Sequence, residues 1–338
     1  MSTILFFQEL SVLGRLDIIL ARIIMKRQEI CDIQGWTGQY RQRRKLVLRV
    51  GTSGYSFPDW KGTVYPPEIV QRDMLTYYAY QLKFDTVEIN YTYYRQPSAR
   101  TLSAMARKVP EEFDFTIKAY KEMTHEIFDE NWHIRDNTDV FKIYAEGIEP
   151  LTEEKRLGCV LFQFPTKFFP KRENKDYILA CRERLPNIPM VIEFRNNAWV
   201  KKEGENWVFS FLEENDLGYC CVDEPDLPRL VPFVPKVTSP VAYFRFHGRN
   251  VNWFNVPASE RYNYLYSDEE LKPFVPVIEA AEEASKTAYV FFNNCHGGSA
   301  ARNARRMKDL LGLVDDALDG PPEGKKEGPE QLGLFQER

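Results

Sequence analysis

Short apolar runs alternate with amphipathic segments along most of this chain. Eight of the runs are rich in Val, Ile, Phe and Tyr, as buried strands are. These predicted strands are Val47–Thr52, Thr86–Asn90, Phe113–Lys118, Cys159–Phe164, Met190–Arg195, Tyr219–Asp223, Val241–His247 and Ala288–Asn293. Helical spacing fills most of the gaps, over Arg72–Gln81, Ser98–Lys108, Thr138–Glu149, Lys175–Arg184, Asn206–Asn215, Asp268–Lys286 and Ser299–Leu311.

This alternation predicts an α/β protein with a parallel sheet. Eight units fit a closed (β/α)8 barrel of the TIM type, which has about 250 residues, and we assign the barrel to residues 46–314. The proline-rich stretch Pro225–Pro240 predicts an irregular barrel around the sixth to seventh strands. A doubly wound open sheet is the alternative, but no glycine-rich nucleotide loop follows the first strand.

The two ends of the chain differ from the barrel. Residues 1–45 are predicted to be an N-terminal extension, and residues 315–338 are predicted to be a flexible tail because they are rich in charge, Pro and Gly. Charged residues interrupt the apolar segment 1–24, so it resembles neither a membrane span nor a signal peptide. An upstream start codon, with Met25 as an alternative start, would also explain this segment.

Composition narrows the class of protein. The chain has 338 residues, of which 43% are hydrophobic and 28% charged, as in ordinary globular proteins. A formal net charge of −4 provides no general attraction to nucleic acid or to anionic membranes. The six cysteines show neither disulfide-framework nor zinc-finger spacing, which predicts a reducing, cytoplasmic location.

Polar side chains gather at the carboxyl ends of the predicted strands. Because strand side chains alternate between two faces, Glu193 and Arg195 share one face, as do Arg245 and His247. In a barrel this face turns inward, and the mouth at the carboxyl ends is where such barrels have their active sites. Buried ion pairs are the alternative, but charged or amide groups at seven strand ends favour a functional site.

These residue types suggest particular roles. Carboxylates can act as a general base or bind a hard metal ion, and a histidine suits proton transfer near neutral pH. The catalytic candidates are Glu88, Lys118, Glu193, Asp223 and His247. Arginines bind phosphate or carboxylate, and aromatic rings stack on sugars or bases. The substrate-binding candidates are Tyr55, Asn90, Tyr94, Gln163, Arg195, Trp199, Arg245, Arg249 and Asn293.

Each of these roles has a structural alternative: packing for a histidine or an aromatic ring, and an ion pair for an arginine. The turn Gly297-Gly298 precedes the last predicted helix, where free backbone N–H groups suit an anion. We therefore expect the turn, together with Arg195, Arg245 and Arg249, to hold a phosphate, sulfate or carboxylate. The sequence identifies no cofactor: a divalent metal is an alternative that we do not favour, because only four histidines are present.

Several of these segments resemble a known family. They are Gly51-Thr52-Ser53-Gly54-Tyr55, Thr86-Val87-Glu88-Ile89-Asn90 with Tyr94-Arg95, Val191-Ile192-Glu193-Phe194-Arg195, Arg245-Phe246-His247-Gly248-Arg249, Arg261-Tyr262-Asn263-Tyr264-Leu265-Tyr266-Ser267 and Phe291-Phe292-Asn293-Asn294. In order over residues 47–312, they resemble the YecE-like family, domain of unknown function 72. The resemblance implies a TIM-type barrel and supplies no reaction. Cys295-His296-Gly297-Gly298 departs from the His-Tyr-x-Gly that many members have there.

The tail carries a second resemblance. Gln331-Leu332-Gly333-Leu334-Phe335 is similar to the peptide by which bacterial repair and replication proteins bind the sliding clamp. We predict that Gln331, Leu332, Leu334 and Phe335 bind such a clamp; an incidental apolar tail is the alternative.

Three hypotheses about function remain at this point. The first is an enzyme that acts on a phosphate- or sugar-containing substrate, linked to nucleic acid and recruited by the clamp. The second is a metabolic isomerase or hydrolase of a small sugar or carboxylate, with no role at DNA. The third is a non-catalytic binding module, against which the charged mouth argues. We expect a small anionic ligand or nucleic acid as partner, and no membrane.

Overall fold

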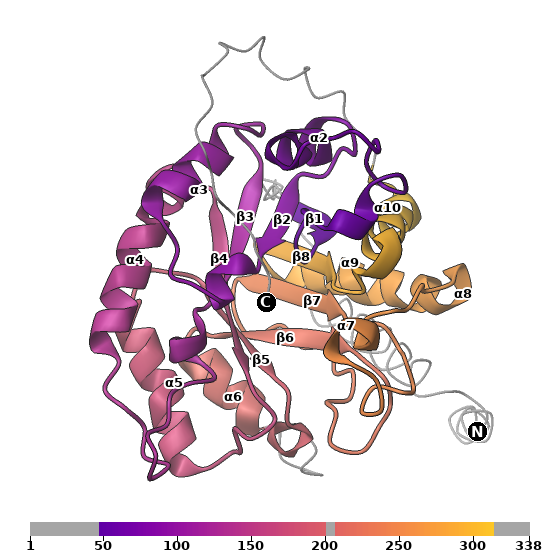
Figure 1. Ribbon diagram of the computed structural model, residues 1–338. Coiled ribbons are helices and arrows are strands. Elements are labelled where there is room, and N and C mark those ends of the chain that lie inside the picture. The colour runs from indigo at the N-terminus through magenta and orange to yellow at the C-terminus, as the bar shows by residue number, and fades with distance from the viewer. Residues whose placement is uncertain (1–46, 201–206, 314–338) are drawn as a thin grey trace, which may run out of the picture.

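The computed structural model describes residues 47–200 and 207–313, and within them eight parallel strands form a barrel. The strands are β1 (Val47–Thr52), β2 (Thr86–Ile89), β3 (Asp114–Lys118), β4 (Leu157–Phe164), β5 (Met190–Phe194), β6 (Gly218–Asp223), β7 (Val241–Phe246) and β8 (Thr287–Phe292). Their order is β1-β8-β7-β6-β5-β4-β3-β2 (Figure 1). The predicted (β/α)8 architecture is therefore confirmed.

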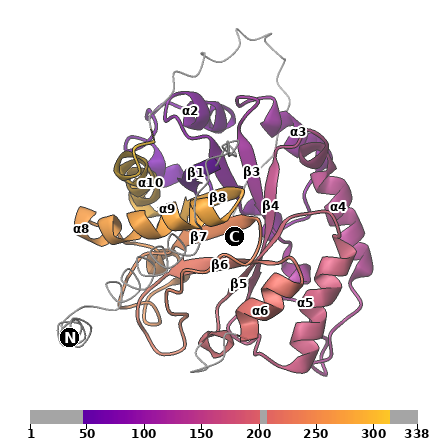
Figure 2. The ribbon, with the colours of Figure 1, turned by 180° about the vertical axis from the view of Figure 1, so that it is seen from behind.

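Helices lie outside the barrel and connect successive strands (Figure 2). They are α2 (Met74–Tyr80), α3 (Ala99–Ala106), α4 (Thr138–Glu153), α5 (Arg172–Arg184), α6 (Trp207–Glu214), α7 (Ala258–Arg261), α8 (Asp268–Leu271), α9 (Val275–Ala284) and α10 (Ser299–Leu310). The helix predicted over 268–286 is divided by a 3-10 turn at Lys272–Phe274. Pro273 and Pro276 explain the division, because proline disrupts the hydrogen bonds of a continuous helix.

The connection between β6 and β7 is irregular, as the prolines predicted. Residues 224–240 cross from one strand to the next without a helix. None of the helices that the structure describes is long and apolar enough to cross a membrane. The predicted N-terminal extension and C-terminal tail lie outside the described residues.

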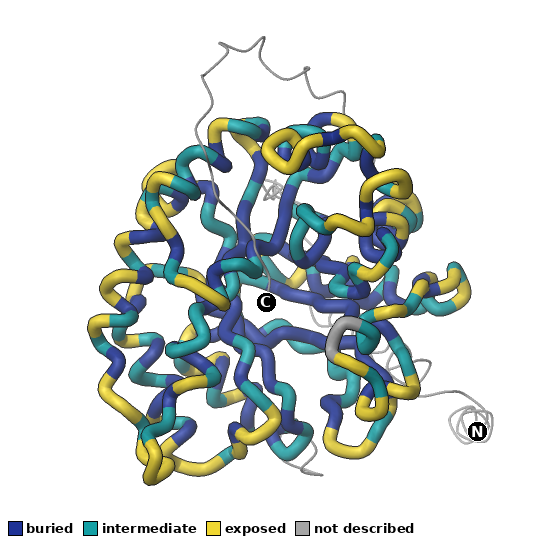
Figure 3. Tube along the Cα trace, viewed as in Figure 1, coloured by how far each residue is buried: buried dark blue, intermediate teal, exposed yellow. Residues whose placement is uncertain are grey.

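The strands separate two hydrophobic cores, and Figure 3 shows the strands as the most buried part of the fold. The larger core lies between the strands and the helices, and it contains Val87, Ile192 and Phe244. A smaller core fills the barrel interior, with Leu161 and Tyr243 among its residues. This division follows from the strict alternation of side chains along each strand.

The barrel closes at a seam between β1 and β2 that a tyrosine completes. The Thr52 N–H donates to the Tyr78 hydroxyl (3.0 Å), and that hydroxyl donates to the Thr86 carbonyl (3.2 Å). Above this point the Gly54 N–H donates directly to the Glu88 carbonyl (2.8 Å). A Cβ on Gly51 would lie 2.4 Å from the Thr86 carbonyl oxygen, so only glycine allows the two strands to approach.

Tyr78→Phe should weaken this seam measurably. The substitution removes the hydroxyl and leaves a buried N–H and a buried carbonyl without their partner, so we expect a loss of about 1–3 kcal/mol in the free energy of unfolding. Chemical denaturation measures the loss. Tyr77→Phe on the same helix is the control, because no hydrogen bond of its hydroxyl occurs within the described residues. Equal stability of both variants would contradict the bridging role.

Candidate functional site

A buried arginine organises the carboxyl end of the barrel. Arg245 on β7 donates through Nε and Nη2 to the two carboxylate oxygens of Glu88 on β2, at 2.9 and 2.7 Å. Its Nη1 donates to Oε2 of Glu193 on β5, at 2.6 Å. All three side chains are inaccessible or nearly so. One guanidinium therefore joins three strands across the interior.

Both carboxylates are held in the ionised form. Burial alone would raise the pKa of Glu88, but its ion pair with Arg245 outweighs burial and lowers that pKa. For Glu193, burial also raises the pKa, but Arg245 and His247 outweigh burial and leave the pKa well below its usual value. Tyr243 contributes as well, because its hydroxyl donates to Glu88 at 2.7 Å.

The other oxygen of Glu193 connects the buried network to the mouth. Its Oε1 accepts from Gln163 Nε2 (2.7 Å) and Arg195 Nη1 (3.2 Å), and lies 3.1 Å from His247 Nε2. Gln163 accepts in turn from Lys118 Nζ (2.8 Å). The network thus runs from fully buried groups to side chains that retain some exposure.

His247 is neutral and fully buried. Burial and the nearby Arg195 lower its pKa to about 3. One ring nitrogen faces Glu193 and the other lies 3.0 Å from Asn293 Nδ2, so that both nitrogens are in hydrogen-bond contact. This arrangement favours a positioning role over the proton transfer predicted from the sequence.

Lys118 is the cation at the rim of the network. Burial, followed by the charge of Arg245, lowers its pKa to about 8. Its Nζ lies 4.8 Å from the centre of the Tyr93 ring. Within the described residues no carboxylate lies at salt-bridge distance from this amine, and Gln163 is its hydrogen-bond acceptor.

Two predicted site residues form a separate pair. Asp223 shares its face of β6 with Tyr219 and Cys221, which pack toward the helices. There it accepts from Arg249 at 2.9 and 2.8 Å and from the Tyr266 hydroxyl at 2.6 Å. The prediction that Asp223 and Arg249 join the mouth is therefore wrong in position, because strand alternation sends Asp223 outward.

The aromatic candidates occupy different surroundings. Trp199 is buried in the outer core, where it stacks on Phe194 with ring centres 4.2 Å apart and donates to the Phe168 carbonyl. Trp199 therefore serves packing, which corrects the prediction that it binds substrate. Tyr94 is 74% exposed. Tyr55 is half-buried, 6.2 Å from Tyr78 between ring centres.

The predicted anion site does not form around the glycine turn. The Gly297 N–H donates to Asp59 Oδ2 at 2.7 Å, so a carboxylate of the protein already occupies it. Arg245 and Arg249 are saturated by carboxylates as well. The structure thus corrects the expectation of surplus donors at the turn, at Arg245 and at Arg249, since each of these three has an internal acceptor.

Glu224 was missed by the sequence analysis. It follows β6 and lies 3.0 Å from Arg195 Nη2, while its other oxygen accepts from the Val231 N–H at 2.8 Å. Burial raises its pKa, although Arg195 opposes the rise. Cys220 and Val222 face the inner core. Because side chains alternate along a strand, Glu224 continues the same face, and this alternation would have indicated it.

Metal ligands do not cluster in the part of the chain described. No group of three or more His, Cys, Asp or Glu side chains there is placed to hold a metal ion. The carboxylates that the sequence offered as ligands, Glu88 and Glu193, are bound by Arg245.

A polar network at the carboxyl ends of a closed parallel barrel defines this protein as a (β/α)8-barrel protein with a strand-end site. Residues 49–327 match the family described as "Protein of unknown function DUF72". The chain belongs to this family, as its motifs predicted.

Relatives agree with this assignment. UPF0759 protein YunF of Bacillus subtilis (strain 168) is 30% identical over 302 residues, which cover 86% of this chain and 100% of YunF. The crystal structure of a DUF72 family protein from Thermotoga maritima MSB8 is 43% identical, with a TM-score of 0.72 over 79% of this chain and 99% of that one. A DUF72 family protein from Enterococcus faecalis V583 is 30% identical, with a TM-score of 0.70 over 80% of this chain and 97% of that one.

The predicted clamp-binding peptide, Gln331–Phe335, lies outside the described residues and beyond the family match. These comparisons support neither clamp binding nor a role at DNA. A cytoplasmic location stays a prediction.

The neutral state of His247 has a consequence for acid stability. Its pKa in the fold, about 3, lies below the ordinary histidine value of 6.5, so the unfolded chain binds a proton that the fold does not. The free energy of unfolding should therefore fall as pH drops from 6.5 toward 3, by up to about 1.4 kcal/mol per pH unit for this group. His247→Gln should reduce that slope.

Denaturation between pH 6.5 and 5.5 measures this slope where most carboxylates remain ionised. His133→Gln, which changes an exposed histidine, is the control. An unchanged slope in His247→Gln would show that His247 is protonated in the fold.

Proposed function

We propose that this protein is an enzyme acting on a small carbonyl compound that carries a sugar or phosphate group, with the Lys118 amine as its reactive group. The supporting observation is the lowered pKa of Lys118, about 8, at the mouth of the barrel. A lysine that is desolvated beside another cation is a recognised source of a neutral, nucleophilic amine. That amine takes a proton beside the carbonyl or adds to the carbonyl carbon.

The buried network supports this amine without touching the substrate. Gln163 accepts from Lys118 and is held by Glu193, which Arg245 fixes in place. Because Glu193 and Arg245 are fully buried, their roles are to orient Gln163 and to set the charge around Lys118. Such second-layer support keeps a reactive group in one geometry.

Several partly exposed groups are available to bind the substrate. Asn293 and Arg195 are at strand ends, and the Arg195 guanidinium lies 5.5 Å from the centre of the Trp253 ring. Asn90 follows β2, and its buried side-chain oxygen Oδ1 has no hydrogen-bond partner within the described residues. An unpartnered buried oxygen suits a substrate hydroxyl as donor.

The charge near Lys118 favours an anionic substrate. Burial and the cations Lys118 and Lys167 lower the pKa of His125 to about 3, so cations dominate this side of the mouth. Lys167 lies over the Trp132 ring at 5.3 Å and is exposed. In the described residues it has no carboxylate at salt-bridge distance, which leaves it available to a phosphate.

Competitive labelling with acetic anhydride tests the state of Lys118. Its rate of acetylation should rise with a midpoint near pH 8, because only the neutral amine reacts. Mass spectrometry of the digest measures the rate, normalised to Lys142, an exposed lysine on α4. Arg195→Gln should raise the midpoint, since the charge of Arg195 lowers the pKa of Lys118. A wild-type midpoint near the ordinary lysine value of about 10.4 would refute a reactive amine.

Borohydride trapping separates the two reactions of the amine. If Lys118 adds to a carbonyl, loss of water gives an imine, which borohydride reduces to a stable secondary amine. Incubation with dihydroxyacetone phosphate or glyceraldehyde 3-phosphate should then add the mass of the compound less one oxygen atom at Lys118. Lys118→Met removes this adduct in the matched experiment. Equal labelling of Lys118 and Lys142 would argue against a specific imine and leave proton transfer.

A further inference from the structure

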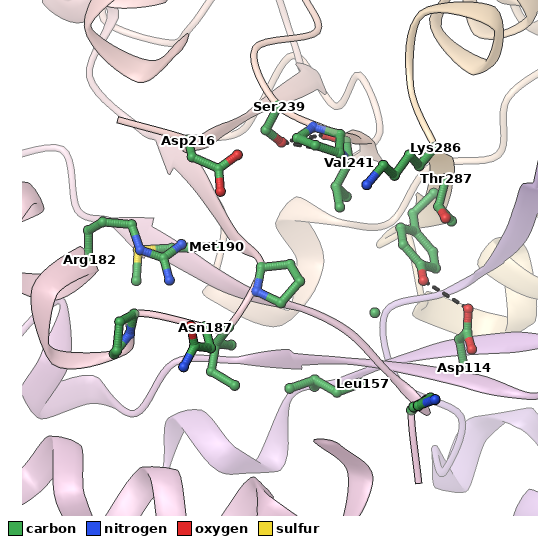
Figure 4. Close-up of a pocket in the computed structure, with 17 residues that line it drawn as sticks. Asp114, Leu157, Arg182, Asn187, Met190, Asp216, Ser239, Val241, Lys286 and Thr287 are labelled. Carbon is green, nitrogen blue, oxygen red and sulfur yellow. Dashed lines mark hydrogen bonds between the residues drawn. The ribbon is translucent and has the colours of Figure 1, made fainter. Parts of the chain in front are cut away.

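A cavity lies at the opposite end of the barrel, away from the mouth. It has a volume of about 550 Å³ and opens at the amino-terminal ends of β4, β5, β7 and β8. Figure 4 shows Arg182 and Asp216 on one side of it, with Lys286 and Asp114 across from them. Its size is in the range of sites for small organic ligands, about 300–1,000 Å³.

The charges around this cavity do not balance. Lys155, Arg182 and Lys286 line it, and none of them has a carboxylate at salt-bridge distance within the described residues. Asp114 is already engaged, because Arg49 Nε lies 2.7 Å from its Oδ2 and the Tyr289 hydroxyl donates to the same oxygen at 2.9 Å.

Asp216 is the remaining carboxylate on the cavity wall, against three cations. The cavity therefore presents a surplus of positive charge to any molecule that enters it. The Arg182 guanidinium also donates to the Leu185 carbonyl, which holds this side chain at the cavity wall.

The walls between the charges are apolar and stiff. Pro186, Ile188, Pro189 and Pro240 belong to the loops that enter β5 and β7, and Leu157 begins β4. Proline fixes its backbone, so these walls need little ordering when a ligand binds. A ligand that fits has an organic part as well as negative charge.

Two of the charged positions adopt a backbone conformation that favours glycine. Lys155 has φ 57° and Asp216 has φ 51°, and both lie in turns between a helix and a strand. Glycine is the residue that adopts this left-handed region most easily, and asparagine tolerates it better than most others. Asp216 can thus be neutralised to asparagine without strain on its turn.

We propose that this cavity is a second binding site, which takes a small organic phosphate with two or more negative charges. Lys155, Arg182 and Lys286 bind the phosphate groups, and the proline-rich wall packs against the organic part. The site does not rest on the function proposed for the mouth, because it is built from the other ends of the strands. A ligand bound there touches β4, β5, β7 and β8 at once, which suits an effector.

Isothermal titration calorimetry with adenosine diphosphate tests the proposal, with pyrophosphate and adenosine as the matched probes. Adenosine diphosphate should bind most tightly, pyrophosphate more weakly and adenosine not measurably. Arg182→Gln and Lys286→Gln should each weaken binding by about tenfold, the effect of losing one charge-assisted contact. Asp216→Asn should strengthen it, because it removes the opposing charge.

Two variants serve as controls. Lys142→Gln changes an exposed cation on α4, outside the cavity, and should leave the affinity unchanged. Lys118→Met should also leave it unchanged, which separates this site from the mouth and from the function proposed there. Circular dichroism confirms that each variant folds.

Three results would overturn the proposal. The first is the absence of heat with either phosphate at millimolar concentration. The second is binding that Lys142→Gln weakens as much as Lys286→Gln does, which would show general attraction to surface charge. The third is binding abolished by Lys118→Met, which would place the phosphate at the mouth.

Discussion

The ion pairs of Arg245 with Glu88 and Glu193 are the constraint on which the upper half of the barrel depends. They place charge where an apolar layer would otherwise fill the interior, and buried charges are tolerated only when they are paired and hydrogen-bonded. The pairing joins β2, β5 and β7, which are not neighbours in the sheet. It also fixes Glu193, on which the orientation of Gln163 and the surroundings of Lys118 depend.

Much of the fold and of the candidate site could be predicted from the sequence, because alternation along a strand is a local property. Eight apolar runs gave the barrel, and parity placed Glu88, Glu193, Arg245 and His247 on the inner face. Position at a strand end is not sufficient by itself, as Asp223 shows. That residue ends its strand as the others do, yet Tyr219 and Cys221 show that it faces the helices.

The pKa values and partners of the site residues depend on contacts between distant segments, and a local sequence pattern does not reveal such contacts. The sequence places His247 among candidates for proton transfer, but its pKa follows from burial and from Arg195 on another strand. The lowered pKa of Lys118 likewise follows from burial and from Arg245, 127 positions along the chain. Alternation along β6 extends to Glu224, but its pairing with Arg195 joins two segments that lie far apart in the sequence.

The seam at Tyr78 ties the integrity of the sheet to the docking of one short helix. β1 and β2 are the two ends of the strand order, and the tyrosine on α2 supplies a link between them. If α2 detaches, two strand edges become exposed together, and exposed edges pair readily with other chains. Local opening at α2 would therefore expose these edges without global unfolding of the barrel.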